Sequence, residues 1–483
     1  MKVLLLHVPK KNQVWAGVPN IFNDRFAYVF PPLAVMYLSA YLKRSTDHEI
    51  EVLDCVVEDL EYPELRRRLA HIRPDVVGVS ATSAHGLVDV RKSIEAIRDT
   101  CPDAFVVMGG AHVNAFPHLA VQFPGIDAAI HGDAEEPLRQ LLSALDEGKH
   151  LEQIPGILLP RTDDEPLLSA PAPPVGDLDS LPFPDREACP AVKYFTPGMK
   201  GHRTTTMMSS RGCPHRCVFC NVPPNYRARS PENVVDEIQE CVEKHGIQDI
   251  HFVDDLFNVS PERVMAISEE ILRRNVKVWW GYKASIRQTT REMIRVAKRA
   301  GCYRMHYGVE TFTEEGLKAL NKNATIDEIF EVFKMTQDEG VKAIAYMIIG
   351  CPHEITARQI LGVGPFMHKL APNYVVYSLF TPYADAPIFP EGAQKGLWET
   401  DCWERFMLNP TEDYDLPTAW EEHMDKDELL RVFKIVNNRF YFHPRTLART
   451  FLSLRTPAEL KHVLLGGYQL LRMWSLRANQ RKI

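Results

Sequence analysis

The first part of the chain, up to about residue 150, alternates short apolar runs with longer segments of helical periodicity. Five runs rich in valine, leucine and isoleucine predict buried strands, at residues 3–8, 50–54, 76–80, 105–108 and 128–130. Three segments between them place apolar residues at helical spacing, at residues 33–42, 87–98 and 136–145. Strands without polar alternation, separated by helices, indicate a parallel sheet covered on both faces. We therefore predict an α/β fold whose N-terminal domain, residues 1–150, is a doubly wound, Rossmann-like sheet.

A second series of strands and helices follows a stretch that loses this periodicity. Residues 151–195 are rich in proline, which fixes φ and removes a hydrogen-bond donor, so we expect an irregular linker there. The next domain, residues 196–395, predicts six strands, at residues 204–209, 249–253, 276–281, 304–309, 343–349 and 374–380. Residues 396–483 predict a mainly helical C-terminal domain.

The composition is that of an ordinary globular protein, with 45% hydrophobic and 25% charged residues among 483. A net charge of -7 argues against a general nucleic-acid binder, so we expect no nucleic-acid partner. The apolar start, residues 1–9, is too short for a signal-peptide core and lacks a small-residue cleavage site. No stretch approaches the ~18 to 20 apolar residues that span a bilayer. We therefore expect a cytoplasmic protein that is soluble or at most peripheral to a membrane.

Seven of the ten cysteines are scattered along the chain, at positions 55, 101, 189, 241, 302, 351 and 402. A reducing compartment is expected without a signal peptide, so these cysteines predict small buried residues rather than disulfides. The other three, Cys213, Cys217 and Cys220, lie in one short loop directly after a predicted strand.

Three thiols in one loop, separated by three and then two residues, suit an iron–sulfur cluster. Cubane clusters normally take four thiolates, so three leave one iron corner open to a chelating small molecule. The alternative is a zinc site completed by His215 or His202. Zinc sites usually present their ligands in two separated pairs, and the sequence has no second pair. We therefore favour the cluster.

The spacing of Cys213, Cys217 and Cys220 resembles the cluster loop of the radical S-adenosylmethionine (SAM) superfamily. In that family the open iron takes the amino and carboxylate groups of SAM, and electron transfer cleaves SAM into methionine and a 5′-deoxyadenosyl radical. The resemblance implies a [4Fe-4S] cluster, SAM, and an external electron donor such as flavodoxin or ferredoxin. It also implies that residues 196–395 form a partial (β/α)6, TIM-like barrel around the substrate.

Later strand ends carry further motifs that resemble this family. Asp254 and Asp255 stand where the family has an acidic or polar patch facing the SAM ammonium, although helix capping fits either aspartate nearly as well. Glu310 resembles the acidic residue after the fourth strand that hydrogen-bonds a ribose diol. Gly350 resembles the glycine after the fifth strand, whose main chain lies against adenine. One departure is Asp385-Ala386, where relatives commonly carry glycine-threonine, so we expect the substrate-side loop to differ.

A doubly wound domain placed before such a barrel resembles the cobalamin-binding domain of B12-binding radical SAM enzymes. Ser80 and Thr82 match the serine loop that meets the displaced nucleotide tail of cobalamin, and Gly109-Gly110 match the paired glycines that let this tail pass. The aspartate-x-histidine-x-x-glycine loop that supplies a lower cobalt ligand is absent after the first strand. The missing loop argues against a histidine ligand on cobalt. It does not argue against cobalamin itself.

Two histidines, His112 and His131, also lie at predicted strand ends of this domain. A lone loop histidine is more often a hydrogen-bonding residue than a metal ligand, so we favour that interpretation for both. A nucleotide or flavin site on a similar sheet is the alternative to cobalamin, since a fold alone does not fix function. The first loop, residues 10–26, shows no phosphate-cradling glycine pattern, and this favours cobalamin.

The last segment, residues 460–483, mixes leucines and aromatics with arginines, as in a basic amphipathic helix. Such a helix can lie on an anionic membrane surface, but a helix that closes the barrel with its apolar face is commoner. We favour the second interpretation and keep peripheral membrane contact as a minority hypothesis.

The resemblance implies a cobalamin-dependent radical SAM enzyme that methylates an unactivated carbon of a small-molecule or lipid-like substrate. In this hypothesis the deoxyadenosyl radical abstracts a substrate hydrogen and methylcobalamin donates the methyl group. Radical cyclisation, ring contraction or oxidation without net methyl transfer is the alternative with the same cofactors. A non-catalytic sensor that binds cobalamin and the cluster is the alternative of another class. The sequence assigns no catalytic side chain and no substrate identity.

Overall fold

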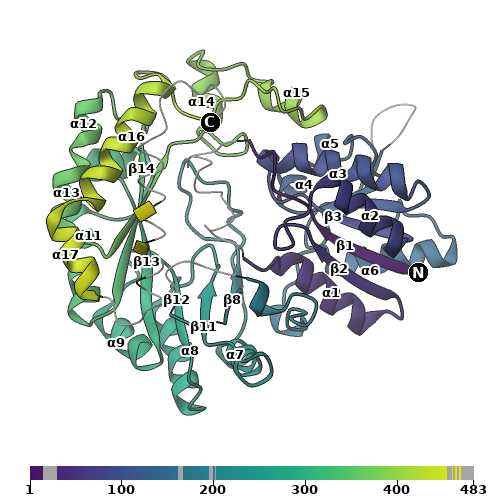
Figure 1. Cartoon of the computed structure of the whole chain (residues 1–483), viewed down its shortest axis with the longest axis horizontal. Coiled ribbons are helices and arrows are strands. Elements are labelled where there is room, and N and C mark those ends of the chain that lie inside the picture. The colour runs from purple at the N-terminus through teal and green to yellow at the C-terminus, as the bar shows by residue number, and fades with distance from the viewer. Residues whose placement is uncertain are drawn as a thin grey trace. The chain divides into compact units, whose positions relative to one another are not determined.

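The structure is a computed structural model in which residues 1–14, 30–160, 167–194, 200–201, 203–453, 460, 463–464 and 467–468 are described. The chain divides into two compact units (Figure 1). The first unit contains Met1–Val14, Pro31–Tyr194 and Glu399–Leu416, and the second contains most of the remaining described chain. His202, which the zinc alternative names as a ligand, lies outside the described residues. Most of residues 460–483 also lie outside them, so the amphipathic helix expected there stays a prediction.

A seven-stranded sheet with the order β2-β1-β3-β4-β5-β6-β7 forms the middle of the first unit. The first five of these strands are parallel, and β6 and β7 continue the sheet in antiparallel orientation. Their bounds are β1 (Lys2–His7), β2 (Glu49–Asp54), β3 (Val76–Ser80), β4 (Phe105–Gly109), β5 (Ala128–Ile130), β6 (Ile157–Leu159) and β7 (Leu167–Leu168). The predicted doubly wound parallel sheet is confirmed, because the strand order reverses direction at β1.

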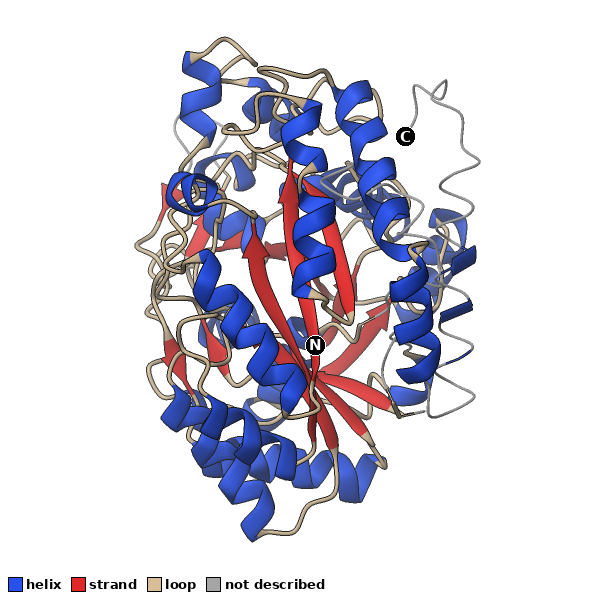
Figure 2. Ribbon diagram, turned by 90° about the vertical axis from the view of Figure 1, so that its left-hand side faces the viewer, coloured by secondary structure: helices blue, strands red, loops and turns tan. Residues whose placement is uncertain are grey.

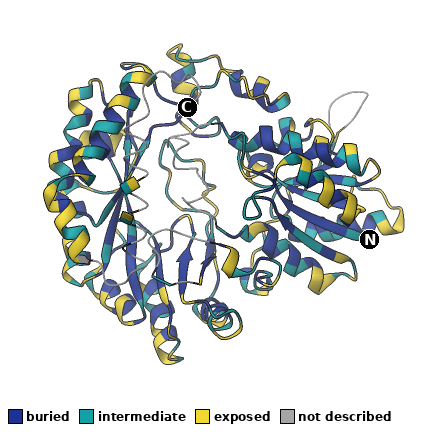
Figure 3. Ribbon diagram, viewed as in Figure 1, coloured by how far each residue is buried: buried dark blue, intermediate teal, exposed yellow. Residues whose placement is uncertain are grey.

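Helices cover both faces of this sheet. The helix α1 contacts α6, whereas α2 contacts α3, so these pairs lie in different layers. Figure 3 shows the strands buried and the outward sides of the helices exposed, as amphipathic covering helices require. The helices of the first unit are α1 (Leu33–Ser45), α2 (Tyr62–Ile72), α3 (Leu87–Thr100), α4 (Ala111–Ala115), α5 (Pro117–Ala120), α6 (Glu135–Glu147) and α15 (Cys402–Leu408).

The proline-rich segment predicted as a linker belongs to the first unit. It supplies β6 and β7, and its side chains bond to the preceding elements. The Asp185 carboxylate accepts hydrogen bonds from Ser39 Oγ at 2.6 Å and Lys43 Nζ at 2.7 Å. The hydroxyl of Tyr194 donates to Asp54 Oδ2 at 2.8 Å. The prolines of this segment hide its short strands in the sequence pattern. Its side chains nevertheless form these hydrogen bonds with the first unit.

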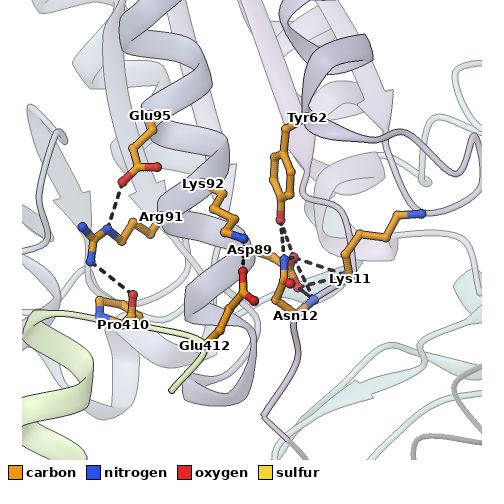
Figure 4. A network of polar contacts seen from close by, with 9 residues as sticks. All are labelled: Lys11, Asn12, Tyr62, Asp89, Arg91, Lys92, Glu95, Pro410 and Glu412. Carbon is orange, nitrogen blue, oxygen red and sulfur yellow. Dashed lines mark hydrogen bonds and ion pairs between the residues drawn. The ribbon is translucent and has the colours of Figure 1, made fainter. Parts of the chain in front are cut away.

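The segment Glu399–Leu416 returns to the first unit from the C-terminal part of the chain. Its helix α15 contacts α5, and the ring of Trp403 lies 5.0 Å from that of His85. Arg91 on α3 donates to the carbonyl of Pro410, and Lys92 pairs with Glu412 (Figure 4). The two compact units therefore do not divide at the predicted boundary, residue 395. The chain after it first enters the first unit, at Glu399–Leu416, and then returns to the second unit.

The second unit is built on an open six-stranded parallel sheet with the order β15-β14-β13-β12-β11-β8. Each strand follows its neighbour in sequence, which is the connectivity of a partial (β/α) barrel, so the predicted fold is confirmed. Figure 2 shows these strands in red with helices around them. The strands are β8 (Thr204–Met207), β11 (Asp249–Phe252), β12 (Trp279–Ala284), β13 (Cys302–Glu310), β14 (Lys342–Ile349) and β15 (Tyr374–Leu379).

Hydroxyl residues begin most of the helices that follow these strands. Ser230, Ser260, Thr290, Thr313 and Thr325 each occupy an N-cap and accept a hydrogen bond from the third helical N–H. Such caps fix where each strand's loop ends and its helix starts. The helices are α7 (Pro231–His245), α8 (Pro261–Arg273), α9 (Arg291–Arg299), α10 (Glu314–Ala319), α11 (Ile326–Asp338), α12 (Ala357–Leu361) and α13 (Val363–Leu370).

Helices α14 (Phe389–Gln394), α16 (Lys426–Tyr441) and α17 (Pro444–Ser453) form the C-terminal region. Helix α16 packs against the edge strand β15 and against α12 and α13. The hydroxyl of Tyr441 donates to the carbonyl of Val375 at 2.5 Å, which satisfies a backbone group of the edge strand. Within the described part of the chain, no helix is long and apolar enough to cross a membrane.

Candidate functional site

The three clustered cysteines lie in an excursion of the chain directly after β8. Two short antiparallel strands, β9 (Ser210–Arg211) and β10 (Arg227–Ala228), close this excursion at its base. Gly212 enters it with a φ of +81°, and a Cβ there would collide with the carbonyl oxygen of Asn225. Only glycine fits this conformation without strain. The loop that presents the thiols is therefore closed at both ends by the backbone.

All three thiols are half-buried and form no disulfide. Burial raises the pKa of each thiol. A neighbouring thiol raises the pKa of Cys213 and Cys217 further, and the carboxylates of Asp255 and Glu310 raise that of Cys220. Across the described ranges, no group of three His, Cys, Asp or Glu side chains is arranged to hold a single metal ion. Three free thiols in one short loop suit three corners of a cubane, where each thiolate binds a different iron. The donor set thus fits the predicted cluster.

The cluster loop is clamped to the turn that follows α10. The backbone N–H of Val218 donates to the carbonyl of Leu320 at 3.3 Å, and Asn321 Nδ2 donates to the carbonyl of Arg216 at 2.6 Å. Asn321 has a φ of +53°, a conformation that asparagine tolerates better than most residues. Val218 also packs against an apolar group that contains Leu320 and Phe380. Backbone and apolar contacts together hold the loop at the carboxyl end of the barrel.

Asp254 has a different environment from the one predicted for a residue that faces SAM. It is 1% exposed, and its carboxylate accepts hydrogen bonds from the N–H and Oγ of Ser209 and from Oγ of Ser210. These bonds occupy the carboxylate and tie the end of β11 to the start of the cluster loop. The structure therefore places Asp254 as a support for the loop.

Asp255, the neighbouring predicted residue, is exposed at the same strand end. Although the side chain is exposed, protein atoms around it desolvate the carboxyl group and raise its pKa, and the positive charge of Lys283 lowers the pKa in part. The N–H of Gly212 also donates to this carboxylate. Of the two aspartates, Asp255 is the one that remains accessible beside the cysteine loop.

A buried ion pair lies under the cluster loop. Arg229 pairs with Glu237 of α7, and the same guanidinium donates to the carbonyl of Met208 at 2.9 Å. Arg263 of α8 donates to the carbonyls of Ser209 at 3.0 Å and of Arg229 at 2.7 Å. Removal of one partner from a buried ion pair is costly, because it leaves the other charge buried and unpaired. These two arginines fix the backbone from which the cysteine loop rises.

Glu310 ends β13 in the left-handed region, with a φ of +64°, directly after an irregularity in the pairing with β14. Its carboxylate forms an ion pair with Lys322 at 3.3 Å. Burial lowers the pKa of Lys322, but Glu310 and Cys217 more than offset this effect, so the pKa is raised. The lysine therefore stays charged between the predicted ribose-binding residue and the cysteine loop.

Gly350 follows β14 with a φ of +75°. Its N–H and that of Cys351 both donate to Oε2 of Glu354, at 2.6 and 2.9 Å. Burial raises the pKa of Glu354 to about 7, although these two donors oppose the shift. The backbone predicted to lie against adenine is thus held in shape by a buried carboxyl group.

The departure at Asp385 is explained by a contact with the cluster loop. Asn221, directly after Cys220, donates from Nδ2 to Oδ2 of Asp385 at 2.9 Å. Ile388 also donates its N–H to the carbonyl of Val218 at 3.1 Å. The loop after β15 therefore braces the cysteine loop in this chain.

The structure brings together the four residues predicted for the cofactor of the first unit. Ala81, between Ser80 and Thr82, donates its N–H to the carbonyl of Gly109 at 2.8 Å. Gly110 has a φ of +117°, and a Cβ there would lie 2.5 Å from the carbonyl oxygen of Ala81. The glycine pair thus lets two loops approach closely at the carboxyl ends of β3 and β4, where such sheets bind ligands.

His112 and His131 differ in their surroundings. His112 is 1% exposed beside the ring of Phe116, and neither of its ring nitrogens has a hydrogen-bond partner among the described residues. Burial lowers its pKa to about 4. Burial and then His118 lower the pKa of His131, which is partly exposed. The hydrogen-bonding role favoured for both histidines stays a prediction.

Sequence reasoning missed the polar side chains that hold the first loop of this unit. Asp89, at the start of α3, accepts hydrogen bonds from the N–H groups of Lys11 and Asn12 and from Tyr62 Oη (Figure 4). His7 Nδ1 lies 2.8 Å from Asp54 Oδ1 at the ends of β1 and β2. A polar residue at the end of a buried strand was the available signal for His7 and Asp54.

Two family models match the chain. The model of the B12 binding domain matches residues 19–142, and the model of the Radical SAM superfamily matches residues 207–357. The first match includes β2 to β5 with the paired glycines, and the second includes β11 to β14 and the three cysteines.

Relatives match the chain over almost its full length. An uncharacterized methyltransferase of Pyrococcus horikoshii is 26% identical over 457 residues, which cover 93% of this chain and 94% of that protein. An anaerobic magnesium-protoporphyrin IX monomethyl ester cyclase of Rubrivivax gelatinosus is 25% identical, over 93% of this chain and 79% of the cyclase. Among solved structures, the cobalamin-dependent S-adenosylmethionine radical enzyme OxsB has a TM-score of 0.70 and 16% identity, over 98% of this chain and 72% of that one. This last likeness supports the fold.

Proposed function

The chain belongs to the B12-binding radical SAM enzymes, and we propose that it transfers a methyl group from SAM to an unactivated carbon of a small molecule. Its cofactors are a [4Fe-4S] cluster, SAM and cobalamin. When bound, they supply a 5′-deoxyadenosyl radical and a cobalt-borne methyl group. The protein positions the cofactors and the substrate and excludes water from them.

We assign the cluster to Cys213, Cys217 and Cys220, and SAM to the strand ends that carry Asp255, Glu310 and Gly350. Asp254 supports the loop and does not meet SAM in this proposal. In the first unit, the loops of Ser80–Thr82 and of Gly109-Gly110 would take the nucleotide tail of cobalamin.

One observation supports this proposal most. A closed loop with three free thiols stands at the carboxyl end of a parallel half-barrel, in a chain that also has a B12 binding domain. The Pyrococcus relative that matches over nearly the whole chain is named a methyltransferase. An external reductant such as flavodoxin or ferredoxin would deliver the electron. A reducing, cytoplasmic compartment would suit the ten cysteines, none of which forms a disulfide.

The cyclase relative favours a second candidate, oxidative ring formation without net methyl transfer. Product analysis of the anaerobically reconstituted enzyme separates the two functions. Methyl transfer predicts S-adenosylhomocysteine together with 5′-deoxyadenosine and a methylated acceptor. A substrate-dependent turnover that yields 5′-deoxyadenosine alone would overturn methyl transfer in favour of the second candidate.

A cysteine control makes the cluster assignment testable by itself. The triple variant Cys213→Ala, Cys217→Ala, Cys220→Ala is expected to lose its iron and its SAM cleavage. Cys101→Ala, at the end of α3 in the first unit, is expected to keep both. Iron retained by the triple variant would contradict the assignment.

A further inference from the structure

The inner face of the barrel sheet carries a group of polar side chains that the proposed function does not use. On β12 the aromatic residues Trp280 and Tyr282 are fully buried on the outer face, so Lys283 points to the inner face. Lys283 is paired in register with His306, and His251 is paired with Gly281 on the same face. Tyr346 joins them from β14, since its hydroxyl lies 3.0 Å from His306 Nδ1. We call His251, Lys283, His306 and Tyr346 the inner polar cluster.

Each of the two imidazoles of this cluster presents one nitrogen that no group among the described residues satisfies. Their ring centroids lie 5.2 Å apart. His251 is only 7% exposed, yet its Nδ1 has no hydrogen-bond partner among the described residues, and neither does Nε2 of His306. Buried polar atoms are nearly always hydrogen-bonded, so such a pair calls for a ligand. If Tyr346 donates to Nδ1 of His306, the proton on Nε2 is available to an acceptor.

Lys283 supplies a positive charge beside these rings. Its charge lowers the pKa of both histidines, after the larger effects of burial and of Arg304, so both imidazoles are neutral. Within the described ranges Lys283 has no ion-pair partner within 4 Å. The positive charge of Lys283 lowers the pKa of the Asp255 carboxyl group, which is exposed at the strand end.

Two other charged side chains, Asp249 and Arg304, lie on the inner face. Asp249 accepts hydrogen bonds from the N–H of Lys200 at 2.7 Å and from Tyr303 Oη at 2.8 Å. Burial raises the pKa of Asp249, and the positive charge of Arg304 opposes this shift. Arg304 crosses over Gly281, where any side chain would collide with it. Asp249 therefore offsets part of the charge of Arg304, and Lys283 adds a second positive charge beside the two histidines.

We propose that the inner polar cluster binds an anionic group, a carboxylate or a phosphate, of the methyl acceptor. The ammonium of Lys283 and the Nε2–H of His306 match the lone pairs of such an anion, and charge-assisted hydrogen bonds are the strong ones. The strand Tyr374–Leu379 adds an apolar neighbour, Val376, which pairs in register with Tyr346 and is 38% exposed. The acceptor is thus an acid with an apolar part. This inference rests on the proposed function, because it assigns the anion to the acceptor.

A carboxylate could also come from SAM, and the experiment separates the two sources. Inorganic phosphate is titrated into the reconstituted holoenzyme by calorimetry, with and without saturating SAM. Phosphate that binds equally well in both conditions supports the acceptor site. Phosphate displaced by SAM would assign the cluster to SAM's own carboxylate and overturn the proposal, as would no phosphate binding at all.

Three variants of matched chemistry complete the test. Lys283→Met is expected to weaken phosphate binding at least ~10-fold, the loss of one charge-assisted hydrogen bond. Lys283→Arg keeps the charge and is expected to stay within ~3-fold of the wild type. Lys334→Met removes an exposed lysine of α11 and is expected to change nothing. Equal binding in Lys283→Met and the wild type, at equal melting temperatures, would overturn the proposal.

A separate measurement keeps this result apart from the proposed function. The small molecules of a producing cell extract are separated on an anion exchanger, and each fraction is tested as acceptor of the labelled methyl group of SAM. An acceptor retained by the exchanger supports the proposal, and one in the flow-through contradicts it. If SAM is cleaved but no fraction is methylated, methyl transfer fails while the phosphate titration still decides the anion site.

Discussion

Lys322 shows how one side chain can link two parts of the site. It forms an ion pair with Glu310, and the charges of Cys217 and Cys213 raise its pKa, so it lies within electrostatic reach of both thiols. A fixed positive charge near a cluster favours the reduced, more negative state. Lys322 is therefore expected to make the cluster easier to reduce.

The variant Lys322→Met should shift the cluster midpoint potential to more negative values. We expect a change on the order of 60 mV, which corresponds to a tenfold change in a one-electron equilibrium. Spectroelectrochemical titration followed by electron paramagnetic resonance measures it. Lys318→Met, on the exposed side of the preceding helix α10, is the control and should leave the potential in place. An unchanged potential in Lys322→Met would exclude this role.

Glu354 makes the stability of the barrel depend on pH. Its native pKa of about 7 lies above its ordinary value of 4.5, so between these values the folded protein holds a proton that the unfolded chain has lost. The free energy of unfolding should therefore fall as the pH rises through this window, by up to about 3 kcal/mol.

The variant Glu354→Gln should remove this pH dependence, because the amide oxygen can still accept from Gly350 and Cys351 without a charge. Chemical unfolding at about pH 5 and about pH 8 measures the difference. The exposed Glu315→Gln is the matched control and should behave like the wild type. A wild type that is more stable at the higher pH by this amount would contradict the assignment to Glu354.

At the scale of single residues, the sequence predicted which residues carry the chemistry of the site better than it predicted which residues they contact. The three cysteines could be recognised from spacing within one loop. The contacts of Asp254 could not be predicted, because only the folded chain brings Ser209 and Ser210 against its carboxylate. Lys322 and Lys283 lie far from the cysteines in sequence, and a lysine in a helix turn or strand gives no signal of its own.

Among the elements, the cluster loop depends on the backbone that closes it. Gly212→Ala would introduce a Cβ against the carbonyl of Asn225 at a φ of +81°. We expect the variant to lose at least half of its iron after reconstitution, since positive φ and the collision both oppose the native loop.

Iron content and the visible spectrum of the purified variant test this expectation. Gly364→Ala, in helix α13, is the control because nothing lies within 4 Å of a Cβ at that position. Alanine there should leave the iron content unchanged and stabilise the helix by up to about 1 kcal/mol. Full iron content in Gly212→Ala would show that the loop can move away from Asn225.

Most strands could be predicted because they are continuous apolar runs with helices between them. The prediction was poorest for β12, expected at 276–281 and found at Trp279–Ala284. Val276 and Val278 are typical strand residues, but they lie in the connection between α8 and β12. The end of the strand was missed because Lys283, on its inner face, is polar and interrupts the apolar run. The short helices α4 and α5 were not predicted, since five or fewer residues show no periodicity.

For the whole molecule, the segment Glu399–Leu416 is the feature that no local pattern could reveal. Its α15 is amphipathic like any covering helix, and the sequence does not say which unit it covers. Trp403, which is 2% exposed, packs against His85, three residues after the loop predicted for the cofactor tail. The segment is thus part of the first unit's structure.

The variant Trp403→Ala should destabilise the first unit by about 3–5 kcal/mol, as expected for a large buried aromatic. Hydrogen exchange is expected to rise together in α15 and at the start of α3. Phe442→Ala, at an exposed position after α16, should cost much less and leave these segments protected. Faster exchange in α15 alone would show that the segment does not support the first unit.

The return of this segment also sets an order for synthesis. The first unit cannot be completed until residue 416 has left the ribosome, by which time all six barrel strands have been made. Domains that are continuous in sequence fold as they emerge, N-terminal domain first. Here the first unit stays incompletely folded until Glu399–Leu416 is synthesised. A nascent chain stalled before residue 399 is therefore expected to expose the surface that α15 later covers.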